Sequence, residues 1–337
     1  MLKRLNQLLL LSITVLLVGG ISLGATIGYL SPAAGSWLGG QIDTTLLVLI
    51  SLLFFGVRFD AIVRSFGHIR FISIAIVANF LVVPLIGYAI ASVLLPDYPL
   101  FMVGLLIYFM SPCTDWFLGF TKLAKGNVAL GTALIPINML LQLMLYPLYL
   151  QLFTHNIVQV DPDIISSTLL QWFLQPLLFA ITLHYLLRLL LKPSVFNHIL
   201  EKVEQVTPWI IALLVLVIFA SNITVILQHS NVFSWLLLGI FIFFVATFLF
   251  GEVISGLFKL RYPEHALLTM TIAARNAPLM LAITMVALPE QPLIYAAIVI
   301  GMLLEFPHLT ALRYMLVKSN GLSPISLLTN LRKKYDS

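Results

Sequence analysis

The chain has 337 residues, of which 61% are hydrophobic and only 9% are charged, and its formal net charge is +5. A soluble domain carries about 25% charged residues, so this composition excludes a soluble protein. It predicts an all-α polytopic membrane protein that lies in a lipid bilayer and has no nucleic acid as a partner.

Ten apolar segments have the length of about 17–25 residues that a helix needs to cross a bilayer. The first is too long for the core of a signal peptide, so we expect it to be a transmembrane helix. We therefore treat residues 1–337 as a single transmembrane domain. The predicted spans are 8–30, 41–57, 71–94, 100–121, 128–152, 165–187, 208–228, 232–257, 265–288 and 292–315.

The basic residues fall in alternate connections between these spans. If the N-terminus is cytoplasmic, the inner connections and the two tails, with Arg313 at the inner end of the tenth span, hold all but one of the 18 Lys and Arg residues. The outer connections hold none of them. Cytoplasmic loops are enriched in Lys and Arg, so the pattern predicts ten helices with both termini in the cytoplasm.

Two of the predicted spans are interrupted by polar residues and proline. The fourth span contains Ser111–Asp115 and the ninth contains Arg275–Pro278. Proline removes a helix hydrogen bond, and non-helical backbone at membrane depth is tolerated only inside protein or beside a water-filled cavity. Two broken helices at corresponding positions indicate a secondary transporter with inverted repeats.

A local sequence match supports a five-plus-five inverted repeat. The segment around Gln142 in the fifth span resembles the segment around Glu305 in the tenth, and a proline soon follows each. Cys113 precedes Gln142 by as many residues as Asn276 precedes Glu305. Because each half has an odd number of helices, the second half must be inverted relative to the first.

Ionisable residues at membrane depth are expensive and usually functional. Glu305 is either a carboxylate satisfied by a neighbouring helix or a proton-binding group. Arg275 cannot release its proton, so it is either a counter-charge or part of an anion site. We favour charge pairing of Arg275 with Asp115 and Glu305, because a paired charge avoids the cost of an isolated one.

Cys113 is the only cysteine of the chain. A lone cysteine in an apolar helix is commonly just a small buried residue. Its position beside Pro112 in a helix break suggests a second interpretation, because a thiol is a soft ligand that suits soft metals and metalloids. The sequence has no CxxC motif, His/Cys cluster or phosphate-binding loop, so we expect no bound metal, no cofactor and no ATP-driven transport by this chain alone.

Four stretches of the sequence are similar to a known family. Ser111–Trp116, followed by Leu123–Asn127, resembles the fourth-helix motif of the arsenite efflux permeases in the bile acid:sodium symporter superfamily. Thr271–Pro278 and Gly301–Pro307 resemble the ninth and tenth helices of that family.

The resemblance implies a fold and a location. Panel helices would lie within 8–57 and 165–228, and core helices within 71–152 and 232–315. Broken helices four and nine would cross in the core. The membrane would be a bacterial inner membrane or a plasma membrane.

The resemblance also implies arsenite export driven by proton exchange, with no enzymatic activity. Cys113 would be the metalloid ligand, with Thr114 and Asn276 as further substrate-binding residues. Glu305 would carry the proton, together with Asp115. A fixed cation at Arg275 would repel sodium, which favours protons as the coupling ion.

Two alternatives stay open at this point. One is a sodium- or proton-coupled symporter of an organic anion in the same superfamily, with Arg275 or the half-helix N-termini holding a carboxylate. The other is an intramembrane enzyme, a receptor or a structural subunit, for which the sequence offers no motif and no extramembrane domain.

Overall fold

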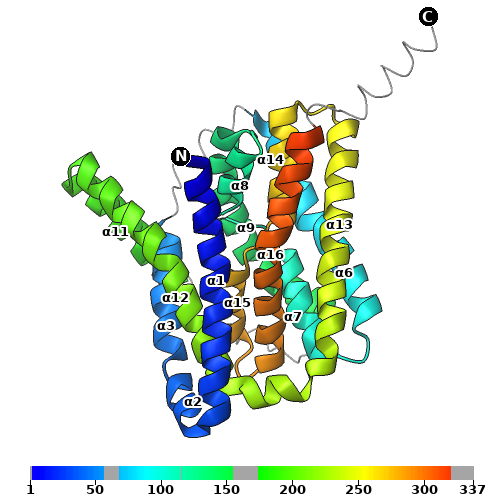
Figure 1. The fold of residues 1–337 in the computed structure, drawn as a ribbon. Helices are drawn as coiled ribbons and strands as arrows, with labels where there is room; N and C mark the ends of the chain where they lie inside the picture. Colours follow the sequence, from blue (N-terminus) through cyan, green and yellow to red (C-terminus); the bar gives the residue numbers. More distant parts are fainter. Residues whose placement is uncertain (1, 57–67, 115, 155–173, 320–337) are drawn as a thin grey trace, which may run out of the picture.

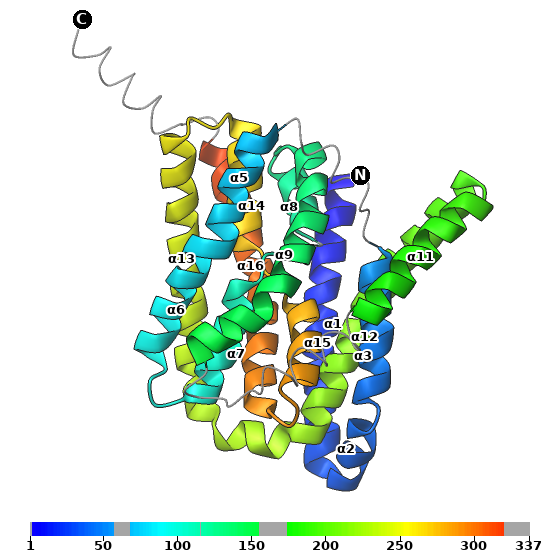
Figure 2. The ribbon, with the colours of Figure 1, turned by 180° about the vertical axis from the view of Figure 1, so that it is seen from behind.

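The computed structural model describes residues 2–56, 68–114, 116–154 and 174–319 (Figures 1 and 2). Every regular element in these ranges is a helix, and they contain no strand. Five of the helical segments are long and apolar enough to cross a membrane, and six if the bent pair of α2 and α3 counts as one span. The protein is a multi-pass membrane protein, while the ten-helix count stays a prediction.

The structure describes sixteen helical elements along the chain. In order they are α1 (Leu2–Leu30), α2 (Pro32–Gly39), α3 (Ile42–Phe55), α5 (Ile69–Val77), the π-helical turn η2 (Ala78–Val82), α6 (Val83–Leu94), α7 (Pro99–Met110), α8 (Phe117–Leu123), α9 (Val128–Thr154), α11 (Gln175–Leu190), α12 (Pro193–Gln228), the 3-10 turn η4 (Ser230–Val232), α13 (Phe233–Leu257), α14 (Tyr262–Ala273), α15 (Ala277–Ala287) and α16 (Pro292–Ser319).

Helical structure extends further than the apolar pattern predicted. Residues 31–40, expected to be a connection, contain α2, which begins after Ser31 because that hydroxyl accepts from the Ala34 N–H at 3.3 Å. The helix expected at 208–228 begins at Pro193. Proline is favoured at the first position of a helix because the N–H that it lacks would have no partner within the helix there. The helix continues through Pro208.

The helices pack in two groups (Figures 1 and 2). In one group α1 packs along α2 and α12, and α3 packs against α11 and α12. In the other, α7 packs against α6 and α16, and α13 packs against α6, α14 and α16. Helix α16 also contacts α1 and α12, and α15 contacts α3, so these helices join the two groups.

Three glycines of α1 allow its close packing against α12. A Cβ built on Gly20 would lie 2.7 Å from the Ala212 carbonyl oxygen. A Cβ on Gly24 would overlap the Leu216 carbonyl oxygen, and Gly28 lies as close to the α12 backbone. Small residues spaced four apart let membrane helices approach closely, and this contact is of that kind.

Replacement of Gly24 by alanine should separate the two helices. Because the clashing atom belongs to the α12 backbone, the helix must move as a whole, at a cost of about 1–3 kcal/mol. Gly19→Ala is the matched control, since a Cβ there meets nothing within 4 Å. Thermal unfolding of the detergent-solubilised protein should show a lower midpoint for Gly24→Ala alone, and equal midpoints for both variants would contradict this packing.

Candidate functional site

The two helix breaks lie against each other and form the centre of the candidate site. Pro112 and Arg275 face each other as an isolated antiparallel bridge. The Cys113 N–H donates to the Ala274 carbonyl at 3.0 Å, and the Asn276 N–H donates to the Ser111 carbonyl at 2.9 Å. Each break therefore satisfies backbone groups of the other, which interrupted helices in a membrane require.

Arg275 is fully buried in this crossing. Its guanidinium donates to the Phe109 carbonyl and to the carbonyls of Thr271 and Ile272. These carbonyls belong to the last turns of α7 and α14. Helix C-termini carry partial negative charge, so one cation caps the ends of both half-helices. The guanidinium also lies 5.6 Å from the centre of the Phe243 ring.

The structure describes one of the two predicted charge partners of Arg275. Asp115 lies outside the described residues. Glu305 is next to Arg275, but the hydrogen bond between them uses the Arg275 backbone N–H, which donates to Glu305 Oε1 at 2.9 Å. The guanidinium itself donates to carbonyl oxygens.

Replacement of Arg275 by methionine should destabilise the protein strongly. It keeps much of the length of the side chain but leaves carbonyls of two half-helices without a donor, and each buried polar group that loses its hydrogen bond costs about 1–3 kcal/mol. Arg261→Met is the control, because the Arg261 side chain is 82% exposed in its ion pair with Glu264 and such pairs contribute about 1 kcal/mol or less. Similar unfolding midpoints for the two variants would contradict the capping role.

Glu305 is fully buried in α16 behind the crossing. Its Oε1 accepts from the indole Nε1–H of Trp116 at 2.7 Å as well as from the Arg275 N–H. Trp116 also packs on Phe306, with ring centres 5.0 Å apart. The carboxylate is thus hydrogen-bonded to a residue of each broken helix, so a change in its protonation state alters contacts at the crossing itself.

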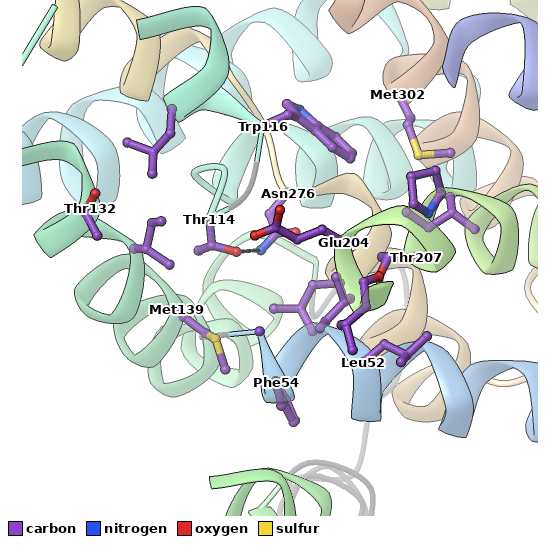
Figure 3. A pocket seen from close by; sticks show the side chains of 18 of the residues that line it. Leu52, Phe54, Thr114, Trp116, Thr132, Met139, Glu204, Thr207, Asn276 and Met302 are labelled. Atoms are coloured by element: carbon purple, nitrogen blue, oxygen red, sulfur yellow. Dashed lines mark hydrogen bonds between the residues drawn. The ribbon is translucent and has the colours of Figure 1, made fainter. Parts of the chain in front are cut away.

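A cavity of about 480 Å³ lies beside the crossing (Figure 3). Helices α1, α3 and α12 line one side of it, and α8, α9, α15 and α16 line the other. Most of the lining is apolar, but Thr114, Trp116 and Asn276 bring polar atoms from the two breaks. The Asn276 Nδ2 donates to the Thr114 Oγ1 at 2.9 Å, as Figure 3 shows.

The structure separates the predicted site residues into two sets. Thr114 and Asn276, expected to bind substrate, line the cavity and touch each other. Cys113, Arg275 and Glu305 are fully buried next to them and are not part of the cavity wall. Cys113 is nonetheless the chain neighbour of Thr114, so it lies one residue behind the wall.

Trp116 and Glu204 are two of the polar residues of the site that were not predicted from the sequence. In the sequence, Trp116 appears only as part of the fourth-helix motif. Nothing in the sequence indicates that its indole N–H bonds to a residue of α16. Glu204 lines the cavity from α12, in a segment that was expected to be a loop because it is polar. Helical spacing of Val203, Thr207 and Ile211, which also line the cavity, is the signal that could have placed Glu204 on a helix.

No metal centre is visible in the part of the chain that the structure describes, where no three His, Cys, Asp or Glu residues are grouped to hold an ion. The crossing instead brings the Thr114 hydroxyl and the Asn276 amide to the cavity wall, beside a Trp116 indole whose N–H is held by the buried Glu305 carboxylate. This arrangement places hydrogen-bonding groups and a buried carboxylate next to a cavity of the size of a small solute.

Comparison with known proteins places the chain among transporters. Residues 44–229 match the model of the sodium bile acid symporter family. The arsenical-resistance protein Acr3 of Corynebacterium glutamicum is 24% identical over 88% of this chain and 85% of its own length. The uncharacterized sodium-dependent transporter YocS of Bacillus subtilis is 24% identical over 76% of this chain and 77% of its own.

A plant protein gives a similar result. The probable chloroplastic sodium/metabolite cotransporter BASS2 of Oryza sativa is 26% identical over 63% of this chain. The match covers 48% of the rice protein, so the chain spans about half the length of this relative.

Proposed function

The chain belongs to the sodium bile acid symporter family, and from this premise we propose that it exports arsenite in exchange for protons. Transport of a small solute across a membrane agrees with the family and with the relatives it resembles. In this proposal the ten predicted spans form two inverted repeats. Helices α5–α9 and α13–α16 act as a core that rocks against the panel of α1–α3, α11 and α12.

The observation that carries the proposal is the character of the cavity at the crossing. The polar groups that the two breaks bring to it are the Thr114 hydroxyl and the Asn276 amide, beside the Trp116 indole whose N–H bonds to Glu305, and none of these is a cation. As(OH)3 is neutral at physiological pH and presents three hydroxyl groups. Such a solute needs hydrogen bonds and a soft ligand more than it needs an opposite charge.

Cys113 supplies the soft ligand in this proposal. A thiol is suited to a metalloid, and a single thiol releases its ligand more easily than a set of several. The thiol is buried behind Thr114 in the described conformation. Substrate therefore reaches it when the core moves and the crossing opens toward the cavity.

The coupling proton is assigned to Glu305. Its carboxylate accepts hydrogen bonds from Trp116 on the cavity wall and from Arg275 in the second break. Protonation weakens both contacts because a neutral acid is a poorer acceptor. Loss and gain of the proton would thus alternate with arsenite binding as the core moves, with Asp115 proposed as a second group on the proton pathway.

The guanidinium of Arg275 favours protons over sodium. Half-helix C-terminal ends and unwound carbonyls are the groups that coordinate Na⁺ in transporters with broken helices. Here the guanidinium already occupies such ends, those of α7 and α14. A sodium ion beside it would meet a fixed positive charge.

The cavity is proposed to face the cytoplasm in this conformation. Two of its lining residues, Gly56 and Leu118, lie a few positions before Arg58 and Lys122 in connections that the charge pattern assigns to the inside. Arsenite would enter from this side, as export requires. The membrane is proposed to be a cell membrane, with both termini in the cytoplasm.

Growth of arsenite-sensitive cells tests the proposal. Cells that express the full-length protein should grow at arsenite concentrations that stop cells with an empty vector, and their arsenite content should be lower. The organic-anion alternative predicts instead no resistance, together with uptake of labelled organic acids into membrane vesicles. That second result would replace the proposal.

A further inference from the structure

Glu204 is the only charged residue among the described residues that line the cavity. It lies in α12, on the panel side, and its carboxylate points into the cavity (Figure 3). Thr207, one turn further along α12, lines the same wall. The cavity therefore has a carboxylate on one side and the uncharged polar groups of the two breaks on the other.

Nothing in the described part of the chain neutralises this carboxylate. No Lys, Arg or His from the described residues lines the cavity. The nearest basic residue in sequence, Lys202, donates to Gln205 at 3.4 Å. Arg275, the cation at the crossing, is buried outside the cavity wall and donates to backbone carbonyls.

A single carboxylate in a concave, largely apolar site has an effect that reaches the whole cavity. Low-dielectric walls focus the field of a charge into the space between them. The cavity then attracts cations and repels anions. A neutral solute with hydroxyl groups feels no net repulsion and can donate a hydrogen bond to the carboxylate.

We propose that Glu204 selects the solutes that enter the cavity by charge, excluding oxyanions such as phosphate and arsenate while admitting neutral, hydroxyl-bearing molecules. This inference rests on the proposed function for its biological meaning, since an exporter of neutral arsenite must not bind or transport the phosphate that is abundant in the cytoplasm. The field itself depends only on the position of the carboxylate.

Chemical modification of a reporter cysteine tests the field without any transported substrate. Thr132 lines the cavity from α9, so Thr132→Cys in a Cys113→Ser background provides a single thiol in the full-length protein. Its rates of reaction with a cationic and an anionic methanethiosulfonate are measured in membranes. With Glu204 present the cationic reagent should react faster, relative to its rate with a free thiol in solution.

Removal of the charge should remove this preference. Glu204→Gln should lower the ratio of cationic to anionic rates by about fivefold or more, the effect of a unit charge at roughly 8 Å in water. Glu201→Gln is the matched control, because Glu201 lies on the same helix and is exposed like Glu204, but does not line the cavity. Glu204→Lys should reverse the preference.

Three results would overturn the proposal. They are an unchanged ratio in Glu204→Gln, an equal change in Glu201→Gln, and a reporter that reacts with neither reagent. A second measurement links the field to transport, because excess phosphate should inhibit arsenite transport in Glu204→Lys but not in the parent protein. If the parent carries no arsenite, the proposed function fails while the modification ratios still decide the role of Glu204.

Discussion

Replacement of Cys113 by serine is expected to abolish arsenite resistance while the protein stays folded. Serine is close in size to cysteine and keeps a small polar side chain, so the packing at this fully buried position changes little. The hydroxyl lacks the affinity of a thiol for a metalloid. Cells that express Cys113→Ser should therefore stop growing at the same arsenite concentration as cells with an empty vector.

The control for this prediction is a second small substitution in the same break. Ser111 is 2% exposed, and its hydroxyl donates to the Ile107 carbonyl at 3.3 Å, in the last turn of the helix that it follows. Ser111→Ala should therefore keep most of the resistance. Fluorescence-detected size-exclusion chromatography checks that both variants are present in the membrane and folded. Resistance that survives in Cys113→Ser would show that the cysteine is only a small buried residue.

Replacement of Glu305 by glutamine should uncouple arsenite movement from protons. Glutamine keeps a side-chain oxygen that can accept from Trp116 and Arg275, as Glu305 Oε1 does, so the crossing stays intact. It cannot bind and release a proton in the physiological range. In vesicles with an imposed pH gradient, arsenite exchange by Glu305→Gln should fall to the level of vesicles without the protein.

A second carboxylate in a membrane helix serves as the matched control. Glu252 in α13 lies 2.8 Å from His265 and is not among the cavity residues. Glu252→Gln should leave gradient-driven exchange close to that of the unmodified protein. If Glu305→Gln keeps normal exchange, the carboxylate is only a structural hydrogen-bond acceptor, and another group carries the coupling proton.

The sequence predicts the breaks of the candidate site well, because proline and polar residues rarely occur together inside an apolar span unless the helix is interrupted there. Thr114 and Asn276 of the two breaks lie together, while their binding of substrate stays a prediction. The sequence does not predict that Arg275 caps two half-helices, since Phe109 and Thr271 contribute only backbone carbonyls there. Backbone partners leave no mark in a sequence, whereas an acidic partner would.

The sequence did not predict the residues that line the cavity from the panel helices, for a different reason. The apolar boundary of the seventh span lies at residue 208, so Glu204 fell in an expected loop. Helix α12 instead continues through this polar stretch and starts at Pro193. Hydropathy marks only the part of a helix that faces lipid or protein. The roles of Cys113 and Glu305, the panel and core, and the inverted repeat remain predictions.

Arsenite transport into everted membrane vesicles is the most direct test of the central claim. In such vesicles the cytoplasmic face is outside, so an exporter that exchanges arsenite for protons moves arsenite inward when the lumen is made acidic. We predict that an acidic lumen drives arsenite accumulation in the absence of sodium, and that a sodium gradient alone does not. Accumulation that requires sodium, or no arsenite movement under a pH gradient, would contradict the account.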